Sequence, residues 1–173
     1  MTKDVKYYFH QTPENLCRDI VRLFQWADNE VVLEPFAGEG AFYRSLPDNV
    51  DKHYTEIEEG MDFRDFDYNN IVVNTVISNP PFKLINSDGK AYNAYNEILT
   101  FFAEKQEIER IIFLVNDACF GSQTVKRMKK LETDNLHLVR IVTCDVKKWY
   151  GRYYVCEYAR EPNYSFDYLE EKY

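Results

Sequence analysis

Short apolar segments alternate with amphipathic segments along most of the 173-residue chain. The strand-like segments are 30–34, 52–57, 74–78 and 110–115. Segments with helical spacing of apolar residues are 13–26, 38–46, 92–106 and 122–131. Two further strand-like segments follow with no helix between them, at 136–143 and 152–158. This order predicts an α/β fold with a mostly parallel sheet, helices on both faces and an antiparallel hairpin at the edge.

Composition is compatible with one such domain. A hydrophobic fraction of 45% is enough for one core without disulfides or metal. The four cysteines lack a Cys-x-x-Cys pair and the three histidines are far apart, so we expect reduced thiols in the cytoplasm and no metal site. No apolar run approaches a membrane span, and the first residues do not resemble a signal peptide.

Charge is distributed unevenly along the chain. The net charge of −8 argues against a surface that binds phosphates generally. Segment 120–152 nevertheless holds eight Lys and Arg against three Asp and Glu, which leaves thirteen basic and twenty-six acidic residues elsewhere. This basic segment fits a nucleic-acid contact, and a solvated helix face with a loop explains it about as well.

A glycine turn follows the first expected strand, in Glu34-Pro35-Phe36-Ala37-Gly38-Glu39-Gly40-Ala41-Phe42. Two glycines at alternate positions let the backbone turn sharply and approach a ligand. The third glycine of dinucleotide-binding turns is missing, which suits a cofactor without phosphate. The acid at the strand end, Glu34, distinguishes this turn from an ordinary strand-to-helix connection.

Carboxylates also follow the second expected strand. Glu56 can accept hydrogen bonds from both hydroxyls of a ribose, although one of three clustered glutamates is equally well explained as a solvated side chain. A few residues later, Asp62-Phe63 places an acceptor beside an aromatic ring, as an adenine pocket requires.

The segment Asn79-Pro80-Pro81-Phe82 comes directly after the apolar strand 75–78. Its prolines cannot donate hydrogen bonds to a sheet, so the strand must end there. The side-chain oxygen of Asn79 and the backbone carbonyl of Pro80 are then expected to be rigid acceptors at the sheet edge. An Asn-Pro-Pro turn ends many strands, but it does not explain why the glycine turn, the acidic strand end and this tetrapeptide occur in order on one sheet.

These motifs together resemble the amino-methyltransferases that use S-adenosylmethionine (SAM), above all the adenine-N6 enzymes of phage, viral and restriction-modification origin. The resemblance runs from Tyr8 to about Tyr158, and the tetrapeptide is its specific part. It implies a Rossmann-like class I fold. We expect residues 1–173 to form one catalytic domain, without the separate target-recognition domain that sequence-reading enzymes of this family usually carry. It also implies SAM as the cofactor, without a metal. The segment Leu114 to Phe120 resembles the next strand end of the family, with Asn116 in place of a common proline.

The resemblance also assigns the contacts to the cofactor. The entry from Tyr8 to Pro13 would hold the methionine end, and the glycine turn would wrap the cofactor. Glu56 would bind the ribose, and Asp62 with Phe63 the adenine. The residues expected to bind SAM are Tyr8, Thr12, Glu34, Pro35, Phe36, Ala37, Gly38, Gly40, Phe42, Glu56, Ile57, Asp62, Phe63 and Asn79.

The tetrapeptide suits methylation of an exocyclic amine, whose lone pair is delocalised into its ring. Two acceptors that take both amine protons draw the nitrogen towards sp³ geometry and stabilise the charge that develops on it. The expected catalytic residues are therefore Asn79, Pro80 and Phe82, with Phe82 stacking on the ring. The expected substrate contacts are Pro81, Phe82, Lys83, Lys126, Arg127, Lys147, Trp149 and Arg152. A plain basic helix face and a packed Trp149 are the alternatives for the later positions.

Adenine N6 in DNA is the expected acceptor, with RNA second. Glutamine N5 in protein and guanine N2 in RNA are chemically compatible, and a SAM-binding subunit without activity is the non-enzymatic alternative. Three alternatives are open for target choice: loose sequence preference, a homodimer, or a protein partner. The expected location is the cytoplasm of the source cell or of a phage or viral host. We expect 83–91 to be a mobile loop beside the acceptor pocket, and Thr12 to be the N-cap of the first helix. The sequence leaves the acidic, aromatic tail 161–173 open.

Overall fold

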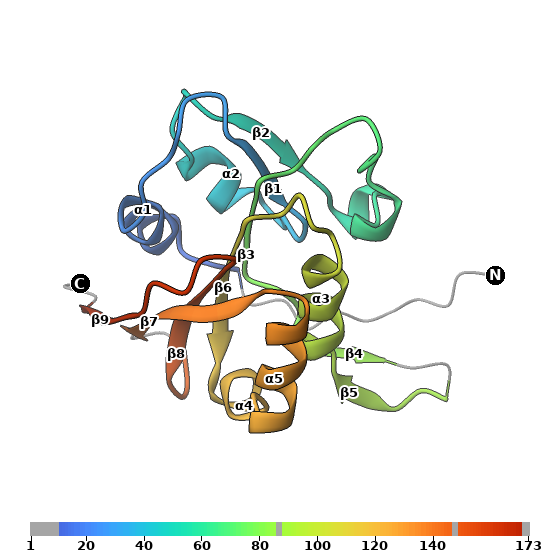
Figure 1. The fold of residues 1–173 in the computed structure, drawn as a ribbon, viewed down its shortest axis with the longest axis vertical. Helices are drawn as coiled ribbons and strands as arrows, with labels where there is room; N and C mark the ends of the chain where they lie inside the picture. Colours follow the sequence, from blue (N-terminus) through green and yellow to red (C-terminus); the bar gives the residue numbers. More distant parts are fainter. Residues whose placement is uncertain (1–10, 86–87, 147–148, 171–173) are drawn as a thin grey trace.

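The computed structural model describes residues 11–85, 88–146 and 149–170, which form a seven-stranded sheet between two layers of helices (Figure 1). The sheet order is β2-β1-β3-β6-β8-β7-β9. The strands are β1 (Val31–Glu34), β2 (Asp51–Tyr54), β3 (Thr75–Ser78), β6 (Arg110–Asn116), β7 (His137–Asp145), β8 (Tyr153–Ala159) and β9 (Ser165–Glu170). Only β8 is antiparallel to its neighbours β6 and β7; the other pairs are parallel.

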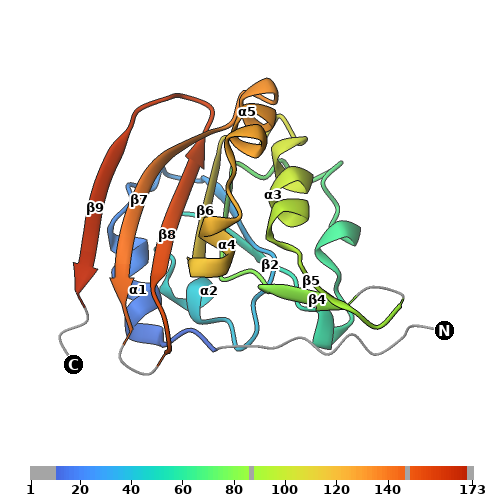
Figure 2. The ribbon, with the colours of Figure 1, turned by 90° about the horizontal axis from the view of Figure 1, so that it is seen from below.

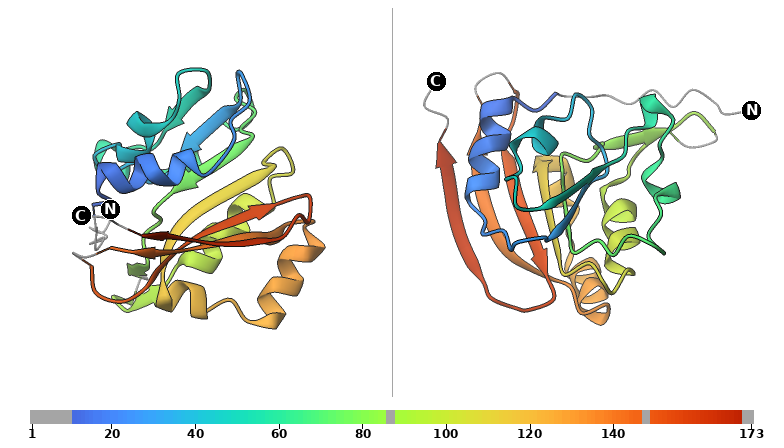
Figure 3. Two further views of the ribbon diagram at one scale, coloured as in Figure 1. Left: turned by 90° about the vertical axis from the view of Figure 1, so that its left-hand side faces the viewer. Right: turned by 90° about the horizontal axis from the view of Figure 1, so that it is seen from above.

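Helices cover both faces of the sheet (Figure 3). On one face lie α1 (Glu14–Arg22) and α2 (Ala41–Ser45). On the other lie α3 (Tyr95–Ala103), α4 (Asp117–Gly121) and α5 (Val125–Thr133). Two 3-10 turns, η1 (Ile57–Glu59) and η2 (Phe63–Asp65), follow β2. Across the ranges that the structure describes, no helix is long and apolar enough to cross a bilayer.

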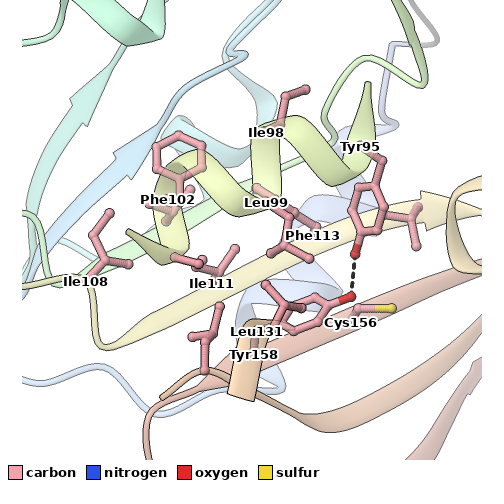
Figure 4. Close-up of a cluster of buried hydrophobic side chains, with 14 of the residues drawn as sticks. Tyr95, Ile98, Leu99, Phe102, Ile108, Ile111, Phe113, Leu131, Cys156 and Tyr158 are labelled. Atoms are coloured by element: carbon pink, nitrogen blue, oxygen red, sulfur yellow. Dashed lines mark hydrogen bonds between the residues drawn. The ribbon is translucent and has the colours of Figure 1, made fainter. Parts of the chain in front are cut away.

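Alternate side chains of the central strands enter two separate cores. Along β6, Ile111 and Phe113 pack beneath α3, whereas Ile112 packs against the α1 layer. Because both faces of this strand are covered, its five buried residues, 111–115, are all apolar instead of alternating with polar residues. Figure 4 shows the core beneath α3, where the buried hydroxyls of Tyr95 and Tyr158 share a hydrogen bond of 2.6 Å. This bond satisfies two polar groups that have no access to water.

The predicted α/β architecture is confirmed, including the antiparallel hairpin of β7 and β8. The hairpin is not at the sheet edge, however. Strand β8 is inserted between β6 and β7, and the tail adds β9 as a parallel strand outside β7, with Arg140 opposite Ser165. The sequence carries no signal for this order, because strand order depends on contacts between distant segments.

The segment 83–91 is not an irregular loop. Its flanks form β4 (Lys83–Ile85) and β5 (Ala91–Asn93), which pair antiparallel and project from the main sheet on the side of α3 (Figure 2). Gly89 has φ of +77°, a left-handed conformation that suits the turn of a hairpin. The expected helix 92–106 therefore begins only at Tyr95, after β5.

The expected N-cap at Thr12 is also wrong. Pro13 occupies the N-cap position of α1 and makes no side-chain cap hydrogen bond. The helix was expected to reach about Trp26, but it ends at Arg22. The indole N–H of Trp26 donates back to the carbonyl of Val21 at 2.9 Å. The hydroxyl of Thr12 has a different partner, described below.

Candidate active site

The carboxyl ends of β1 and β3 lie at the point where the strand order reverses. From β1 the chain reaches β2 on one side, and β3 pairs with β1 on the other. Ligands of open α/β sheets bind at such a switch point. Two cavities are found here, and Phe36 lines both.

The first cavity, which we call the apolar pocket, lies between the η1–η2 segment, β4 and α3. It is lined by Pro35, Phe36, Glu56, Ile57, Met61, Asp62, Phe63, Arg64, Pro81, Leu84, Glu97, Ile98 and Phe101. The second, which we call the Asn79 cleft, has a volume of about 670 Å³. It is lined by Gln11, Thr12, Pro13, Glu14, Glu34, Phe36, Ala37, Gly38, Glu39, Ala41, Phe42, Arg44, Glu58, Asn79 and Trp149.

The glycine turn is held by the carboxylate of Glu34. Gly38 and Gly40 have φ of +54° and +75°, in the left-handed region that favours glycine. Gly40 is the N-cap of α2 and has no side chain to cap the helix. Glu34, only 2% exposed, takes that role because its Oε2 accepts from the backbone N–H of Tyr43 at 2.7 Å. Burial raises the pKa of Glu34 to about 8, against the opposing effect of this hydrogen bond.

Glu56 joins the end of β2 to the same turn. Its side chain is buried, and Oε2 accepts from the N–H of Gly38 at 2.5 Å while Oε1 accepts from the N–H of Glu58 at 3.1 Å. The interpretation of Glu56 as a merely solvated glutamate is therefore wrong. Each oxygen keeps a second lone pair, so the carboxylate can still accept hydrogen bonds from a ligand.

Asp62 and Phe63 form one end of the apolar pocket. Asp62 accepts hydrogen bonds from the backbone N–H and the Nε of Arg64, both at 2.9 Å. The side-chain hydrogen bond from Arg64 lowers the pKa of Asp62 and keeps the carboxylate ionised. The ring of Phe63 lies 4.9 Å from that of Phe36 and 5.0 Å from that of Phe101, centroid to centroid. The pocket thus combines aromatic walls with one fixed acceptor.

Asn79 follows β3 at the wall of the Asn79 cleft. Its side chain is half-buried, and Pro80 and Pro81 behind it are buried. The amide Nδ2 of Asn79 donates to the hydroxyl of Thr12 at 3.1 Å, across 67 positions of sequence. With the nitrogen end of this planar amide on Thr12, the oxygen end is turned away from Thr12.

Aromatic rings continue from the tetrapeptide to the β7–β8 connection. Phe82 lies 6.3 Å from Tyr153, and Tyr153 lies 4.6 Å from Trp149, which lines the Asn79 cleft. Tyr150 next to it is fully exposed. The structure therefore places Trp149 at the same cleft as Asn79, as the sequence suggested for a substrate contact.

The expected cationic contacts lie at different places. Arg152 is exposed and forms an ion pair with Asp117, with 3.5 Å between Nε and Oδ1. Lys83 is exposed at the start of β4. Lys126 and Arg127 lie on α5 and are not among the residues that line either cavity. Arg127 lines a separate groove between α3 and α5.

Most of the residues expected to bind SAM converge on the two cavities. Those that line them are Thr12, Glu34, Pro35, Phe36, Ala37, Gly38, Phe42, Glu56, Ile57, Asp62, Phe63 and Asn79. Gly40 shapes the turn without lining either cavity, and Tyr8 and Lys147 lie outside the described residues. Among the residues that the structure describes, no group of three or more His, Cys, Asp or Glu side chains could hold a metal ion.

Sequence reasoning missed part of the apolar pocket. The residues it did not nominate are Met61, Arg64, Leu84, Glu97, Ile98 and Phe101. Ile98 and Phe101 have the spacing of any core-facing helix, so the sequence offers no sign that they line a pocket. The position of Arg64 could have been predicted in part. An Asp side chain often accepts from the backbone N–H two residues later, which would have placed Arg64 beside Asp62.

Known structures share this arrangement of the chain. No family model matches the sequence, and no curated protein is significantly similar to it. A Listeria monocytogenes protein described as a class I SAM-dependent methyltransferase has a TM-score of 0.67 and 16% identity, over 94% of this chain and 66% of its own. The chain has the class I SAM-dependent methyltransferase fold. This confirms the Rossmann-like class I fold that the motifs implied.

Two further solved structures show the same fold at greater length. A modification subunit assigned to a type I restriction enzyme from Vibrio vulnificus has a TM-score of 0.63 at 14% identity, over 95% of this chain and 47% of that one. DrdV, solved in complex with DNA, has a TM-score of 0.60 at 14% identity, over 93% of this chain and 27% of its own. The chain thus spans less than two thirds of each of these three proteins.

Proposed function

We propose that this protein transfers a methyl group from SAM to an exocyclic amino nitrogen, with N6 of adenine in DNA preferred and RNA second. The observation that carries the proposal is the position of Asn79. It directly follows β3, its amide nitrogen donates to the hydroxyl of Thr12, and it lines the same cleft as the glycine turn.

The two cavities suit the two ends of SAM. The apolar pocket offers Phe63 and Asp62 to an adenine ring, and Glu56 offers lone pairs to the ribose hydroxyls. The Asn79 cleft would take the methionine end, beside Thr12 and the glycine turn. When bound, SAM supplies a methyl group that its sulfonium makes electrophilic. The class I fold supports this choice of cofactor, and the reaction needs no metal.

The tetrapeptide supplies the acceptors that activate the amine. Oδ1 of Asn79 and the carbonyl of Pro80 would each accept one proton of the exocyclic amine, so the nitrogen lone pair turns out of the ring plane. As positive charge develops on the nitrogen, these fixed dipoles bind it more strongly. The buried prolines keep the acceptors in place without a strong base. Phe82 would stack on the acceptor ring and set its plane.

Nucleic acid is the proposed acceptor because an aromatic side chain, Trp149, lines the cleft beside Asn79. Trp149, with the exposed Tyr150 beside it, suits a base that has been extruded from its stack, which costs a few kcal/mol or requires a single strand. Lys83, Lys126, Arg127 and Arg152 are the candidates for phosphate contacts, and none of them lines either cavity. The net charge of −8 opposes phosphate binding, which favours help from a basic protein partner in target choice.

Nucleoside mass spectrometry tests the proposal. Unmethylated DNA and RNA are incubated with the protein and methyl-labelled SAM, then digested and analysed. We expect labelled N6-methyl-2′-deoxyadenosine from DNA, and retained SAM binding with about 10²–10³-fold slower transfer in Asn79→Ala. Asn163→Ala, which removes an exposed asparagine amide, is the matched control and should behave as the unchanged protein.

Each other outcome of that experiment is informative. Label recovered only in protein would replace the nucleic-acid acceptor by a glutamine amide, and label in guanosine would point to guanine N2. SAM binding without transfer to any pool would favour a non-catalytic subunit. Full activity in Asn79→Ala would remove Asn79 from the mechanism.

A further inference from the structure

Arg44 is the one cationic side chain among the described residues that line the Asn79 cleft. The wall of the cleft also holds four carboxyl side chains, those of Glu14, Glu34, Glu39 and Glu58. A surface with such an excess of acid attracts cationic groups and repels a carboxylate. Arg44 is the residue there whose charge can offset this repulsion for an anionic group that enters the cleft.

The guanidinium of Arg44 lies beside the glycine turn. Arg44 is in the last turn of α2, and its Nη1 donates to the backbone carbonyl of Glu39. The same nitrogen lies 3.5 Å from the position that a Cβ on Gly40 would occupy. Nη2 lies 3.5 Å from Oε2 of Glu14, in the first turn of α1. Contacts with the turn and with α1 thus hold the guanidinium at the wall of the cleft.

These contacts leave donors of Arg44 for a ligand. A guanidinium has five N–H donors in a fixed fork, and the two contacts engage Nη1 and Nη2 once each. The Arg44 side chain is 51% exposed, so a ligand in the cleft can reach it. The pair with Glu14 is also exposed and therefore weak enough to be exchanged for a ligand. Two parallel N–H groups match the two oxygens of a carboxylate, which a lysine ammonium cannot do.

The methionine end of SAM carries charges that this cleft would match. It combines a sulfonium and an ammonium group with one carboxylate, so its two cations suit the acidic wall and its carboxylate suits the guanidinium. We propose that Arg44 binds this carboxylate and makes the site selective for a cofactor that has one. The inference rests on the function proposed above, which puts the methionine end in the Asn79 cleft. Arg44 is not among the residues that the sequence motifs nominated.

The test compares SAM with decarboxylated SAM, which differs from it only in this carboxylate. Calorimetry gives the Kd of both ligands for the unchanged protein, Arg44→Gln and Arg44→Lys. We expect the unchanged protein to bind SAM about tenfold to a hundredfold more tightly than decarboxylated SAM. Arg44→Gln should lose most of this preference by weakening SAM alone, and Arg44→Lys should keep part of it. Arg22→Gln, which removes an exposed cation on α1, is the matched control and should keep the full preference.

Two results would overturn the inference while SAM binding remains. A preference for SAM that survives in Arg44→Gln would mean that another group binds the carboxylate. Equal weakening of both ligands in Arg44→Gln would make Arg44 a residue of the fold. If the unchanged protein bound neither ligand, the proposed function would fail together with this inference. A preference that depends on Arg44, in a protein that methylates nothing, would support the inference and refute the methyl transfer instead.

Discussion

Two parts of the site are held together in different ways. We call the glycine turn with Glu34 and Glu56 the cofactor half, and the β7–β8 connection with Trp149, Arg152 and its partner Asp117 the acceptor half. In the cofactor half, Glu34 and Glu56 are 2% and 3% exposed, and each accepts hydrogen bonds from backbone N–H groups of a turn. In the acceptor half, the side chain of Asp117 is 46% exposed and that of Arg152 is 76% exposed. Hydrogen bonds in the interior are shielded from competition with water, whereas an exposed ion pair is weakened by the surrounding solvent. The cofactor half is therefore built in advance, and the acceptor half can adjust to what it binds.

The largest effect should come from Glu56. Changing Glu56 to alanine leaves the N–H groups of Gly38 and Glu58 without their acceptor and removes the proposed ribose contact. Each hydrogen bond to a charged group is worth about 1.5–3 kcal/mol, so calorimetry should show SAM affinity about a hundredfold weaker. Glu59→Ala, an exposed neighbour in the same cluster, should change the affinity little. Equal losses in both variants would contradict the distinction between the two halves.

The next effect concerns the glycine turn. Alanine at Gly38 has to adopt φ of +54°, and its methyl group would meet no protein atom within 4 Å, so it would point into space left for a ligand. We expect SAM affinity to fall about tenfold and the free energy of unfolding by about 1 kcal/mol.

Gly89→Ala is the control for backbone strain. Gly89 also has positive φ, +77°, with no protein atom within 4 Å of an added methyl group, but it lies in the β4–β5 turn. It should lose similar stability and bind SAM normally. If Gly89→Ala weakened SAM binding as much as Gly38→Ala, strain alone would explain both results.

A smaller effect is expected in the acceptor half. Asp117 accepts from the hydroxyl of Tyr154 at 3.0 Å and from the N–H of Arg152 at 3.3 Å, which ties the start of β8 to the end of β6. Asp117→Ala should raise the KM for nucleic acid severalfold by loosening the segment beside Trp149, at unchanged SAM affinity. Glu107→Ala, exposed near the other end of β6, should leave both constants unchanged. A change in SAM affinity with no change in KM would show that the halves are not separate.

The last effect is one on stability. Burial raises the pKa of Glu34 from 4.5 to about 8, so the folded protein binds this proton more tightly than the unfolded chain. The resulting stability is complete below about pH 4.5 and is lost as the pH rises through about 8. Urea unfolding between pH 5 and 9 should show this decline, and Glu34→Gln should lessen it. Parallel pH profiles for the two proteins would mean that Glu34 titrates normally.

Local chemistry made part of the site predictable. The glycine turn, Glu56, Asp62-Phe63 and the tetrapeptide are short motifs whose residues carry their own geometric requirement, and the structure gathers them around two adjoining cavities. The β4–β5 hairpin was missed because Asp88-Gly89 suits a loop as well as a hairpin turn. Strand β9 was left open because an outer strand forms only once its neighbour exists. The residues of α3 that line the apolar pocket could not be predicted, because apolar residues have the same helical spacing whether they face a core or a pocket.

By itself the sequence determined the class of fold, the order of its elements and the residues at each strand end, because hydrophobic period, proline and glycine act over a few residues. Only the tertiary structure decided that Thr12 binds Asn79, that Glu56 binds Gly38 and that Trp149 reaches the same cleft. Those pairs join segments 67, 18 and 70 positions apart, and the helices and strands must pack before such side chains can meet.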